Sequence, residues 1–168
     1  MFLCLLFIAA TTAAADAHAE DLTPLEVTTG WSSTWGYIDR SGRWVIPPQF
    51  NRADLFSEGL ARVQVHGKDG FIDLAGRLVI APQFDLAGHF AEGLAPVMLG
   101  RKWGYIDPTG YRVIKPQFDW PGTFSDGRAC VELLHRDWDK ATQGPEPPIW
   151  FYIDRDGRRL ASPGRRCP

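Results

Sequence analysis

Trp35-Gly-Tyr-Ile-Asp-Arg-Ser-Gly-Arg-Trp-Val-Ile-Pro-Pro-Gln-Phe50 is the stretch that decides the fold, because closely similar stretches follow it at a fixed distance. Its glycine recurs as Gly70 and Gly104, so the step is 70 − 36 = 34 and 104 − 70 = 34 residues. The same step relates Asp39, Asp73 and Asp107; Gly42, Gly76 and Gly110; Ile46, Ile80 and Ile114; Pro48, Pro82 and Pro116; Gln49, Gln83 and Gln117; Phe50, Phe84 and Phe118; Phe56, Phe90 and Phe124; Gly59, Gly93 and Gly127; Ala61, Ala95 and Ala129; and Val63, Val97 and Val131. A period this strict indicates internal duplication, and it outweighs local propensity in predicting the fold.

A fourth, partial copy begins 47 residues after Trp103, as Trp150-Phe-Tyr-Ile-Asp-Arg-Asp-Gly157. The extra 47 − 34 = 13 residues fall in a polar, proline-rich stretch, and that composition predicts a loop between units. The predicted organisation is therefore a lead-in, three repeats, an inserted loop, a partial repeat and a tail. Their bounds are 20–33, 34–67, 68–101, 102–134, 135–149, 150–160 and 161–168.

Each unit is predicted to hold three β-strands. The first two form a hairpin across Asp39-Arg-Ser-Gly42, because an Asp that opens a turn and a Gly that closes it suit a type I turn with a left-handed glycine. The same structural role is expected of Asp73, Gly76, Asp107, Gly110, Asp154 and Gly157. Pro48 and its equivalents are expected to end the second strand, because proline cannot donate to a ladder.

The third strand, Leu60-Ala-Arg-Val-Gln-Val65, places Ala61, Val63 and Val65 on one apolar face, which the other copies repeat. Phe50 and Phe56 are expected to fill the space between hairpin and third strand. A unit of 34 residues buries too little surface to fold alone, so the units must stack. The prediction is an all-β, curved or tubular array of three-stranded repeats, with an incomplete propeller-like arrangement as the alternative.

The Trp-Gly-Tyr-Ile-Asp, Val-Ile-x-Pro-Gln-Phe and Phe-x-Glu/Asp-Gly-x-Ala-x-Val segments, recurring in order, resemble the WG (also KWG) repeat family. The resemblance covers about residues 34–134 and 150–160. Asp69 departs from it at the Trp place of the second copy, and Phe151 departs at the Gly place of the fourth. The resemblance implies a mostly bacterial, often exported interaction module without a defined activity.

The amino terminus resembles a secretory leader. Met1–Ala10 is apolar, and the A-x-A patterns Ala15-Asp-Ala17 and Ala17-His-Ala19 follow it. No Lys or Arg precedes the apolar run, and a buried N-terminal element is the alternative. We expect residues 1–19 to be removed, the mature chain to lack a membrane span, and the protein to be periplasmic or secreted. The net charge of −2 without a basic patch gives no reason to expect nucleic acid.

Removal of the leader would leave Cys130 and Cys167, an even pair in an exported chain, and therefore a disulfide candidate. Cys130 lies on the variable face of the last third strand, and Cys167 lies in the tail. A bond between them would close a loop of 167 − 130 = 37 residues and cap the C-terminal end of the array.

No catalytic constellation is visible. The repeated aspartates are expected to serve turns, and Glu58, Glu92 and Asp126 are expected to bond locally. Asp-x-x-Gly offers too few ligands for calcium, and the histidines lack metal-ligand spacing, so neither a metal nor another cofactor is predicted.

The prediction is a non-catalytic module that binds a protein or another cell-envelope component, through positions that vary between copies. The candidate contact residues are Trp44, Arg62, Gln64, Leu78, Met98, Arg112, Trp120 and Arg128, with Leu60 and Leu94 beside them. The alternative is a carbohydrate- or peptidoglycan-binding module that uses four tryptophans expected to be exposed, Trp31, Trp44, Trp120 and Trp138.

Overall fold

The structure is a computed structural model of the 168-residue chain, and it describes residues 21–30, 32–134, 138–139, 144–145, 149–161 and 167. The expected leader, Trp31, most of the inserted loop and most of the tail lie outside the described residues, as does the side chain of Trp138.

The described residues form strands and turns, and no α-helix occurs among them, so the predicted all-β class is confirmed. The strands are β1 (Thr23–Thr29), β2 (Ser32–Ile38), β3 (Trp44–Phe50), β4 (Arg52–Ala53), β5 (Ala61–Val65), β6 (Lys68–Ile72), β7 (Leu78–Phe84), β8 (Leu86–Ala87), β9 (Ala95–Leu99), β10 (Lys102–Ile106), β11 (Arg112–Phe118), β12 (Ala129–Leu133), β13 (Trp138–Asp139), β14 (Gly144–Pro145) and β15 (Ile149–Ile153). No helix in the part of the chain that the structure describes is long and apolar enough to cross a membrane.

The sheets do not coincide with the repeats. The third strand of one copy pairs with the hairpin of the next, which gives the antiparallel sheets β1-β2-β3, β4-β5-β6-β7, β8-β9-β10-β11 and β12-β15. A short fourth strand, β4 or β8, adds to the three that the sequence predicts per unit. Because neighbouring copies share a sheet, the hydrogen-bonded ladder itself ties each copy to the next.

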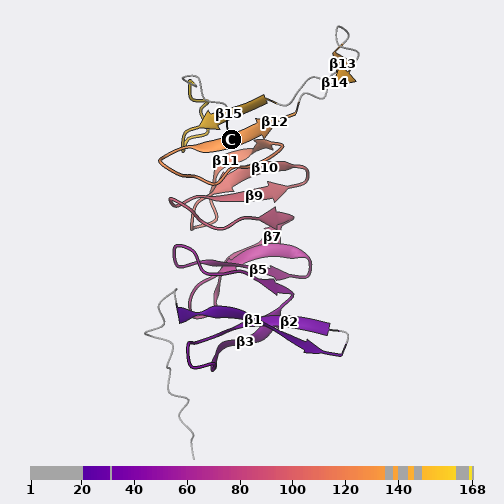
Figure 1. Ribbon diagram of the computed structural model, residues 1–168, viewed down its shortest axis with the longest axis vertical. Coiled ribbons are helices and arrows are strands. Elements are labelled where there is room, and N and C mark those ends of the chain that lie inside the picture. Colours follow the sequence, from indigo (N-terminus) through magenta and orange to yellow (C-terminus); the bar gives the residue numbers. More distant parts are fainter. Residues whose placement is uncertain are drawn as a thin grey trace, which may run out of the picture.

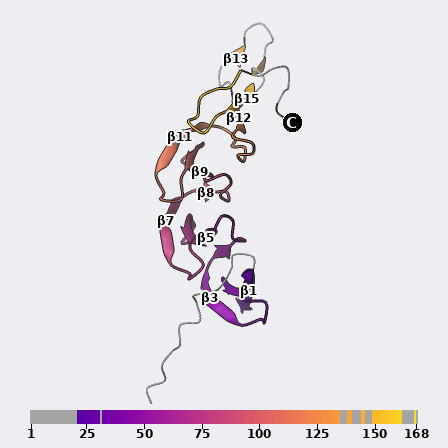
Figure 2. The ribbon, with the colours of Figure 1, turned by 90° about the vertical axis from the view of Figure 1, so that its left-hand side faces the viewer.

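The four sheets lie one above another along the longest axis of the molecule (Figures 1 and 2). This arrangement is a linear stack and not the radial one of a propeller. Each apolar core lies between two consecutive sheets. Tyr37 and Phe50 of the first sheet, for example, meet Val63 and Ile72 of the second. Phe50 is buried, and the half-buried Phe56 places its ring 5.0 Å from that of Tyr37.

The hairpin turns follow from their Asp and Gly. The Asp39 carboxylate accepts hydrogen bonds from the backbone N–H groups of Ser41 and Arg43, at 2.8 and 3.0 Å. Gly42 closes the turn at φ 80°, a conformation that costs glycine little because it has no Cβ. Asp73, Asp107 and Asp154 accept the equivalent backbone hydrogen bonds.

The prediction that Pro48, Pro82 and Pro116 end the second strand is wrong. β3, β7 and β11 continue through them to Phe50, Phe84 and Phe118. Each proline lies where the register shifts: Trp35 pairs with Phe50 but Tyr37 pairs with Ile46, so β3 has two more residues than β2 in this interval. A bulged edge strand needs no donor at that point, so the proline is tolerated there.

The same bulge explains the glycine of each Trp-Gly pair. A Cβ built on Gly36 would lie 2.4 Å from the carbonyl oxygen of Ile46, and one on Gly104 would lie 2.3 Å from that of Ile114. In the fourth copy the described residues after the turn pair with β15 at Ile153 and Arg159 but form no further strand beside it, so Phe151 is accommodated at this position. Its buried ring packs 6.2 Å from that of Phe118 and closes the last core.

Neighbouring copies are also in contact outside the ladders. Gly76, Gly110 and Gly157 lie against the side chains of Ile46, Ile80 and Ile114 of the preceding copy. The expectation that Glu58 and Glu92 bond locally is wrong, because their carboxylates accept hydrogen bonds from the next copy, from Gly93 N and Gly127 N. The reason is the linear stack, which places equivalent turns next to each other.

Candidate binding surfaces

The predicted contact residues fall into three separate regions. Trp44, Leu78 and Arg112 begin the edge strands β3, β7 and β11. Arg62, Gln64 and Met98 lie on β5 and β9, where consecutive sheets meet. Trp120 and Arg128 lie beside β12, at the C-terminal end of the stack (Figure 1). The structure therefore does not bring Trp44 and Trp120 together.

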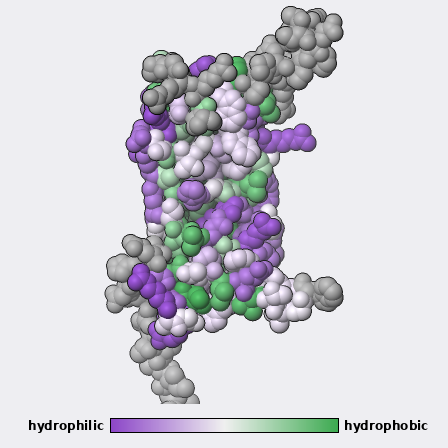
Figure 3. All heavy atoms as spheres, viewed as in Figure 1, coloured by the Kyte–Doolittle hydropathy of each residue, from purple (hydrophilic) through white to green (hydrophobic). Residues whose placement is uncertain are grey.

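The face of the stack that Figure 1 presents carries no single dominant patch. Figure 3 shows hydrophobic residues, in green, interspersed with hydrophilic ones, in purple, over this face. The candidate surfaces are therefore distinguished by the residues that particular strands present, and each is described separately below.

The first region is a surface that we call the edge-strand wall, made by β3, β7 and β11, which lie one above another on the left side of Figure 2. Trp44 and Leu78 are 41% and 52% exposed, and Val79 beside Leu78 is 45% exposed. Arg112, the equivalent of Trp44 in the third copy, is exposed and makes no hydrogen bond or ion pair with the described residues. The wall thus presents an apolar half and a cationic end.

The same wall carries residues that sequence analysis found but did not interpret, the repeated glutamines Gln49, Gln83 and Gln117. They are the only positions identical in the three complete copies whose side chain is exposed in every copy. None of the three amides makes a hydrogen bond with a described residue. The other shared side chains serve turns, bulges or cores, so this position lacks an evident role within the fold.

The second region is a partly buried polar cluster around Arg62. Its guanidinium donates to Asp54 at 2.8 Å, to the carbonyl of Ala87 at 2.7 Å and to Asp69 at 3.3 Å. Burial by itself lowers the pKa of Arg62, but the hydrogen bond and charge of Asp54 and the charge of Asp69 outweigh it, so the pKa is raised. Arg62 stays charged, and its charge is neutralised within the fold.

Asp69 stands where the other two complete copies have tryptophan, and the groups around it are polar too. It is 2% exposed and accepts from Gln64 at 3.2 Å and from the backbone N–H of Ala87 at 2.8 Å. In the third copy the equivalent pair across the strands is Met98 opposite Trp103, an apolar pair. The polar pair Gln64 and Asp69 in the second sheet and the apolar pair Met98 and Trp103 in the third sheet thus occupy equivalent places.

The predicted positions Leu60 and Leu94 serve packing. Leu94 is 3% exposed in the last core, and Leu60 packs against the middle core, so both join neighbouring units. An open hollow of about 350 Å³ lies beside the cluster, lined by Glu26, Trp35, Arg52, Asp54 and Arg62 among others. Its walls carry both signs of charge, and the half-buried Arg62 is already paired.

The third region, the C-terminal end face, consists of Trp120, Arg128, Glu132, Trp150 and Tyr152. Glu132 lies opposite Trp120 on one side and opposite Trp150 on the other. Residues directly opposite one another share a sheet face, so two indoles flank one carboxylate. Val131 and Phe151, which alternate with these residues, point into the last core, so the end face points away from the stack.

The two indoles of this end face are exposed to solvent. Trp120 is 58% exposed and Trp150 is 41% exposed. The guanidinium carbon of Arg128 lies 5.0 Å from the centre of the Tyr152 ring, a cation–π distance. Trp150 and Tyr152 were not among the predicted contact residues. The signal that could have identified them is the pairing of the fourth copy with the third strand, which places Trp150 opposite Glu132.

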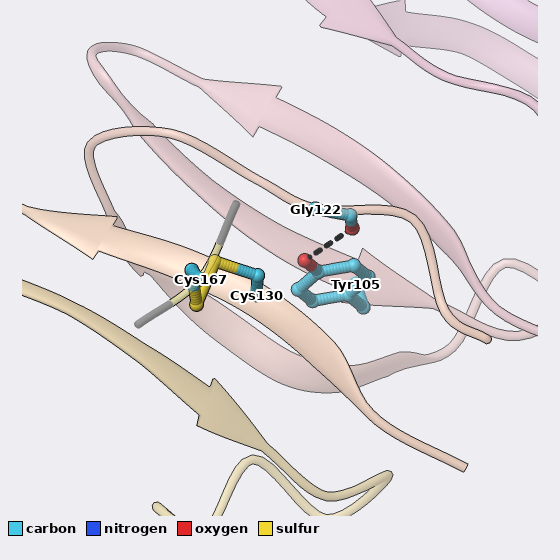
Figure 4. The surroundings of a disulfide bond; sticks show 4 residues. All are labelled: Tyr105, Gly122, Cys130 and Cys167. Atoms are coloured by element: carbon cyan, nitrogen blue, oxygen red, sulfur yellow. Dashed lines mark hydrogen bonds between the residues drawn. A yellow bond between two sulfur atoms is a disulfide. The ribbon is translucent and has the colours of Figure 1, made fainter. Parts of the chain in front are cut away.

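A disulfide joins Cys130 to Cys167 across the same end of the array, as the sequence analysis expects, with the two Cα atoms 5.9 Å apart (Figure 4). Figure 4 also shows the Tyr105 hydroxyl, which donates to the carbonyl of Gly122 at 2.7 Å. Gly122 approaches β12 closely, because a Cβ there would lie 2.1 Å from the carbonyl oxygen of Cys130. The disulfide fixes Cys167 of the tail to β12, the last complete third strand.

The repeated carboxylates are engaged in turns. Hydrogen bonds from the Ser41 side chain and the Arg43 backbone lower the pKa of Asp39 to about 2, and the Thr109 side chain lowers the pKa of Asp107. One such carboxylate occurs per copy. The described residues hold no group of three or more His, Cys, Asp or Glu side chains that could bind a metal ion.

A family model described as a WG containing repeat matches residues 35–68, 70–103 and 103–133. The chain belongs to the WG-repeat family. The three matches correspond to the three complete copies, so the WG unit spans a sheet boundary: its Trp-Gly strand completes one sheet and its third strand begins the next. No curated protein and no solved structure matches this WG-repeat chain.

Proposed function

We propose that this WG-repeat chain is a non-catalytic, exported interaction module that binds a protein or another component of the cell envelope. The observation that carries the proposal is the C-terminal end face. Trp, Tyr and Arg are the residues most enriched at the energetic centres of protein interfaces, and this face gathers Trp120, Trp150, Tyr152 and Arg128 around one carboxylate.

Two features support export. The apolar run Met1–Ala10 is followed by small residues, in the pattern of a secretory leader. The disulfide between Cys130 and Cys167 suits an oxidising compartment, since disulfides persist outside the cytosol. Mass spectrometry of the protein recovered from expressing cells tests this, because export predicts loss of about the first 19 residues. An intact amino terminus on a cytosolic protein would contradict it.

Binding is tested with the double variant Trp120→Ala/Trp150→Ala and a matched control, Tyr111→Ala. Tyr111 is 70% exposed and lies at the third hairpin turn, away from the end face. We expect wild type and the control to retain the same envelope proteins from detergent-solubilised membranes and periplasm, and the double variant to lose them. Equal retention by all three chains would refute binding through the end face.

A second candidate is carbohydrate binding at the same face. An indole stacks on the apolar face of a sugar ring, and the Glu132 carboxylate accepts hydrogen bonds from sugar hydroxyl groups. Pull-down on purified, protein-free cell-wall glycan separates the candidates. Retention of wild type that Trp120→Ala/Trp150→Ala abolishes would favour sugar, whereas retention only by protein-containing fractions would favour a protein partner.

A further inference from the structure

We propose that two copies of this chain associate side by side, in opposite directions, through the edge-strand wall of β3, β7 and β11. The proposal is independent of the C-terminal end face. It starts from the repeated glutamines, whose side chains are identical, exposed and without a described hydrogen-bond partner in all three copies. A carboxamide both donates and accepts, so two facing glutamine amides satisfy each other.

The even spacing of the repeated glutamines allows the row that they form along the edge-strand wall to pair with the same row of a second chain. Stacked sheets lie about 10 Å apart, so the amides of consecutive copies are expected to be evenly spaced. A two-fold axis parallel to β7 then places Gln83 opposite the partner's Gln83 and Gln49 opposite the partner's Gln117. This is the isologous contact typical of two-fold dimers, in which one surface patch meets itself.

The residues at the start of the strands agree with the same axis. Trp44 faces the partner's Arg112, which gives a cation–π pair on each side of the dimer. Leu78, which is 52% exposed, faces the partner's Leu78. Lys115, which like Arg112 is an exposed cation of the third copy, faces the partner's Pro47. The antiparallel orientation thus keeps Arg112 and Lys115 of one chain away from the partner's Arg112 and Lys115. A parallel pair would bring these like charges together.

Sheet extension is a poor alternative for these edges. Each edge strand carries a proline in its bulge, which removes a donor and breaks the regular ladder. Association through side chains of the wall needs no such ladder. Three strands of seven residues stacked at this spacing give a wall of about 20 by 30 Å, or roughly 600 Å² per partner, near the lower end of specific interfaces. We therefore expect a reversible dimer with micromolar affinity.

The test is sedimentation velocity on the mature, disulfide-bonded chain over a range from low micromolar to submillimolar concentration. Wild type is expected to pass from monomer to dimer. Leu78→Lys and Leu78→Glu are each expected to remain monomeric, because residue 78 lies on the two-fold axis and would face its own charge. An equimolar mixture of the two variants is expected to recover the dimer, because Lys then faces Glu.

The matched control is Leu55→Lys. Leu55 is 65% exposed and lies outside the three wall strands, and the equivalent positions are His89 and Thr123, so a polar residue is compatible with the fold. This variant is expected to dimerise like wild type. Circular-dichroism melts of all variants verify that they fold. Wild type that stays monomeric throughout, a Lys–Glu mixture that stays monomeric, or loss of the dimer in Leu55→Lys would each overturn the proposal.

The orientation is tested with Trp44→Arg, which would place two arginines against each other in the antiparallel pair and is expected to weaken dimerisation at least about tenfold, the effect of 1.4 kcal/mol. Adding Arg112→Glu to the same chain is expected to restore it, because the arginine introduced at position 44 would then face a glutamate in the partner. Failure of the second change to restore the dimer would exclude the antiparallel arrangement.

Discussion

The carboxylate of Glu58 accepts a hydrogen bond of 2.9 Å from the backbone amide of Gly93, which lies 35 positions further along the chain. Glu58 has φ 52° and Gly59 has φ 80°, so the two residues form a tight turn in which both are left-handed. A glutamate is unfavourable in that conformation. The link to the next copy offsets this cost, and Glu92 repeats it with Gly127.

Replacement of Glu58 by alanine is therefore expected to destabilise the chain by about 1 kcal/mol, through loss of one charge-assisted hydrogen bond at an exposed site. Urea unfolding measures the loss. The matched control is Asp126→Ala, which removes an acid from the same left-handed position of the third copy, where no described residue donates the equivalent hydrogen bond. Equal losses for the two variants would show that turn strain alone, and not the link between copies, determines the effect.

Gly104 and Phe151 occupy equivalent positions, but we expect a larger side chain to destabilise the fold at position 104 and a smaller one to destabilise it at position 151. Gly104→Ala places a Cβ against the backbone of Ile114 and Pro116, and we expect a loss of about 3 kcal/mol from overpacking. Phe151→Ala removes a buried ring, and we expect a similar loss of about 3 kcal/mol, here from a cavity. Thermal unfolding of both variants checks this. If Gly104→Ala were as stable as wild type, the bulge would have to shift and make room for the added methyl group.

Much of the fold follows from the period of the sequence, because a residue repeated every 34 positions must occupy equivalent environments in a linear stack. The turn at Asp39 and Gly42 was predictable, because an aspartate carboxylate accepts backbone hydrogen bonds within a turn and glycine adopts a positive φ at little cost. The course of β3 beyond Pro48 was not predictable from proline's lack of a donor, because the bulge depends on its partner strand. β1, which takes the place of a third strand before the first copy, was missed because it lies outside the repeat.

The candidate surfaces were less predictable, since exposure depends on stacking. Variation between copies identified Trp44 and Leu78 as candidates, and both are exposed. The same criterion selected Leu94, which the next unit buries. Variation therefore marks both solvent-facing positions and joints between units, and only the three-dimensional arrangement separates them.

The pair Arg62 and Asp69 is expected to be more costly to break than to replace. Asp69→Ala leaves the half-buried guanidinium without one of its two carboxylates, and we expect a loss of about 3 kcal/mol. Arg62→Met/Asp69→Leu removes both charges and is expected to be closer to wild type in urea unfolding. A double variant that is less stable than Asp69→Ala would instead show that the charges stabilise this joint.

Loss of the disulfide is expected to lower the stability of the folded chain. Because it closes a loop over 37 positions, the chain-entropy relation gives roughly 3–4 kcal/mol for Cys130→Ala/Cys167→Ala in urea unfolding. The single variants are expected to lose as much, because either one opens the loop. If the double variant matches oxidised wild type, the tail does not restrain the unfolded chain as the relation requires.

Acid is expected to weaken the fold through its turn carboxylates. The pKa of Asp39 is lowered to about 2, chiefly by the Ser41 side chain. Burial alone would raise the pKa of Asp73, but hydrogen bonds from Arg77 outweigh it, and a hydroxyl hydrogen bond lowers the pKa of Asp107. An aspartate in the unfolded chain has a pKa of about 3.9, so between about pH 2 and 4 the unfolded chain binds more protons than the folded one. This contribution to stability is complete above that window and is lost as the pH falls through it.

The urea midpoint of wild type is accordingly expected to change little between neutral pH and about pH 5 and to fall steadily below it. The control is the triple variant Asp39→Asn/Asp73→Asn/Asp107→Asn, in which each amide oxygen still accepts the turn hydrogen bonds but does not titrate. Its midpoint is expected to fall less steeply with acid, with some dependence left from Asp85, whose pKa Lys68 lowers. A triple variant as acid-sensitive as wild type would assign the acid response to groups outside the repeated turns.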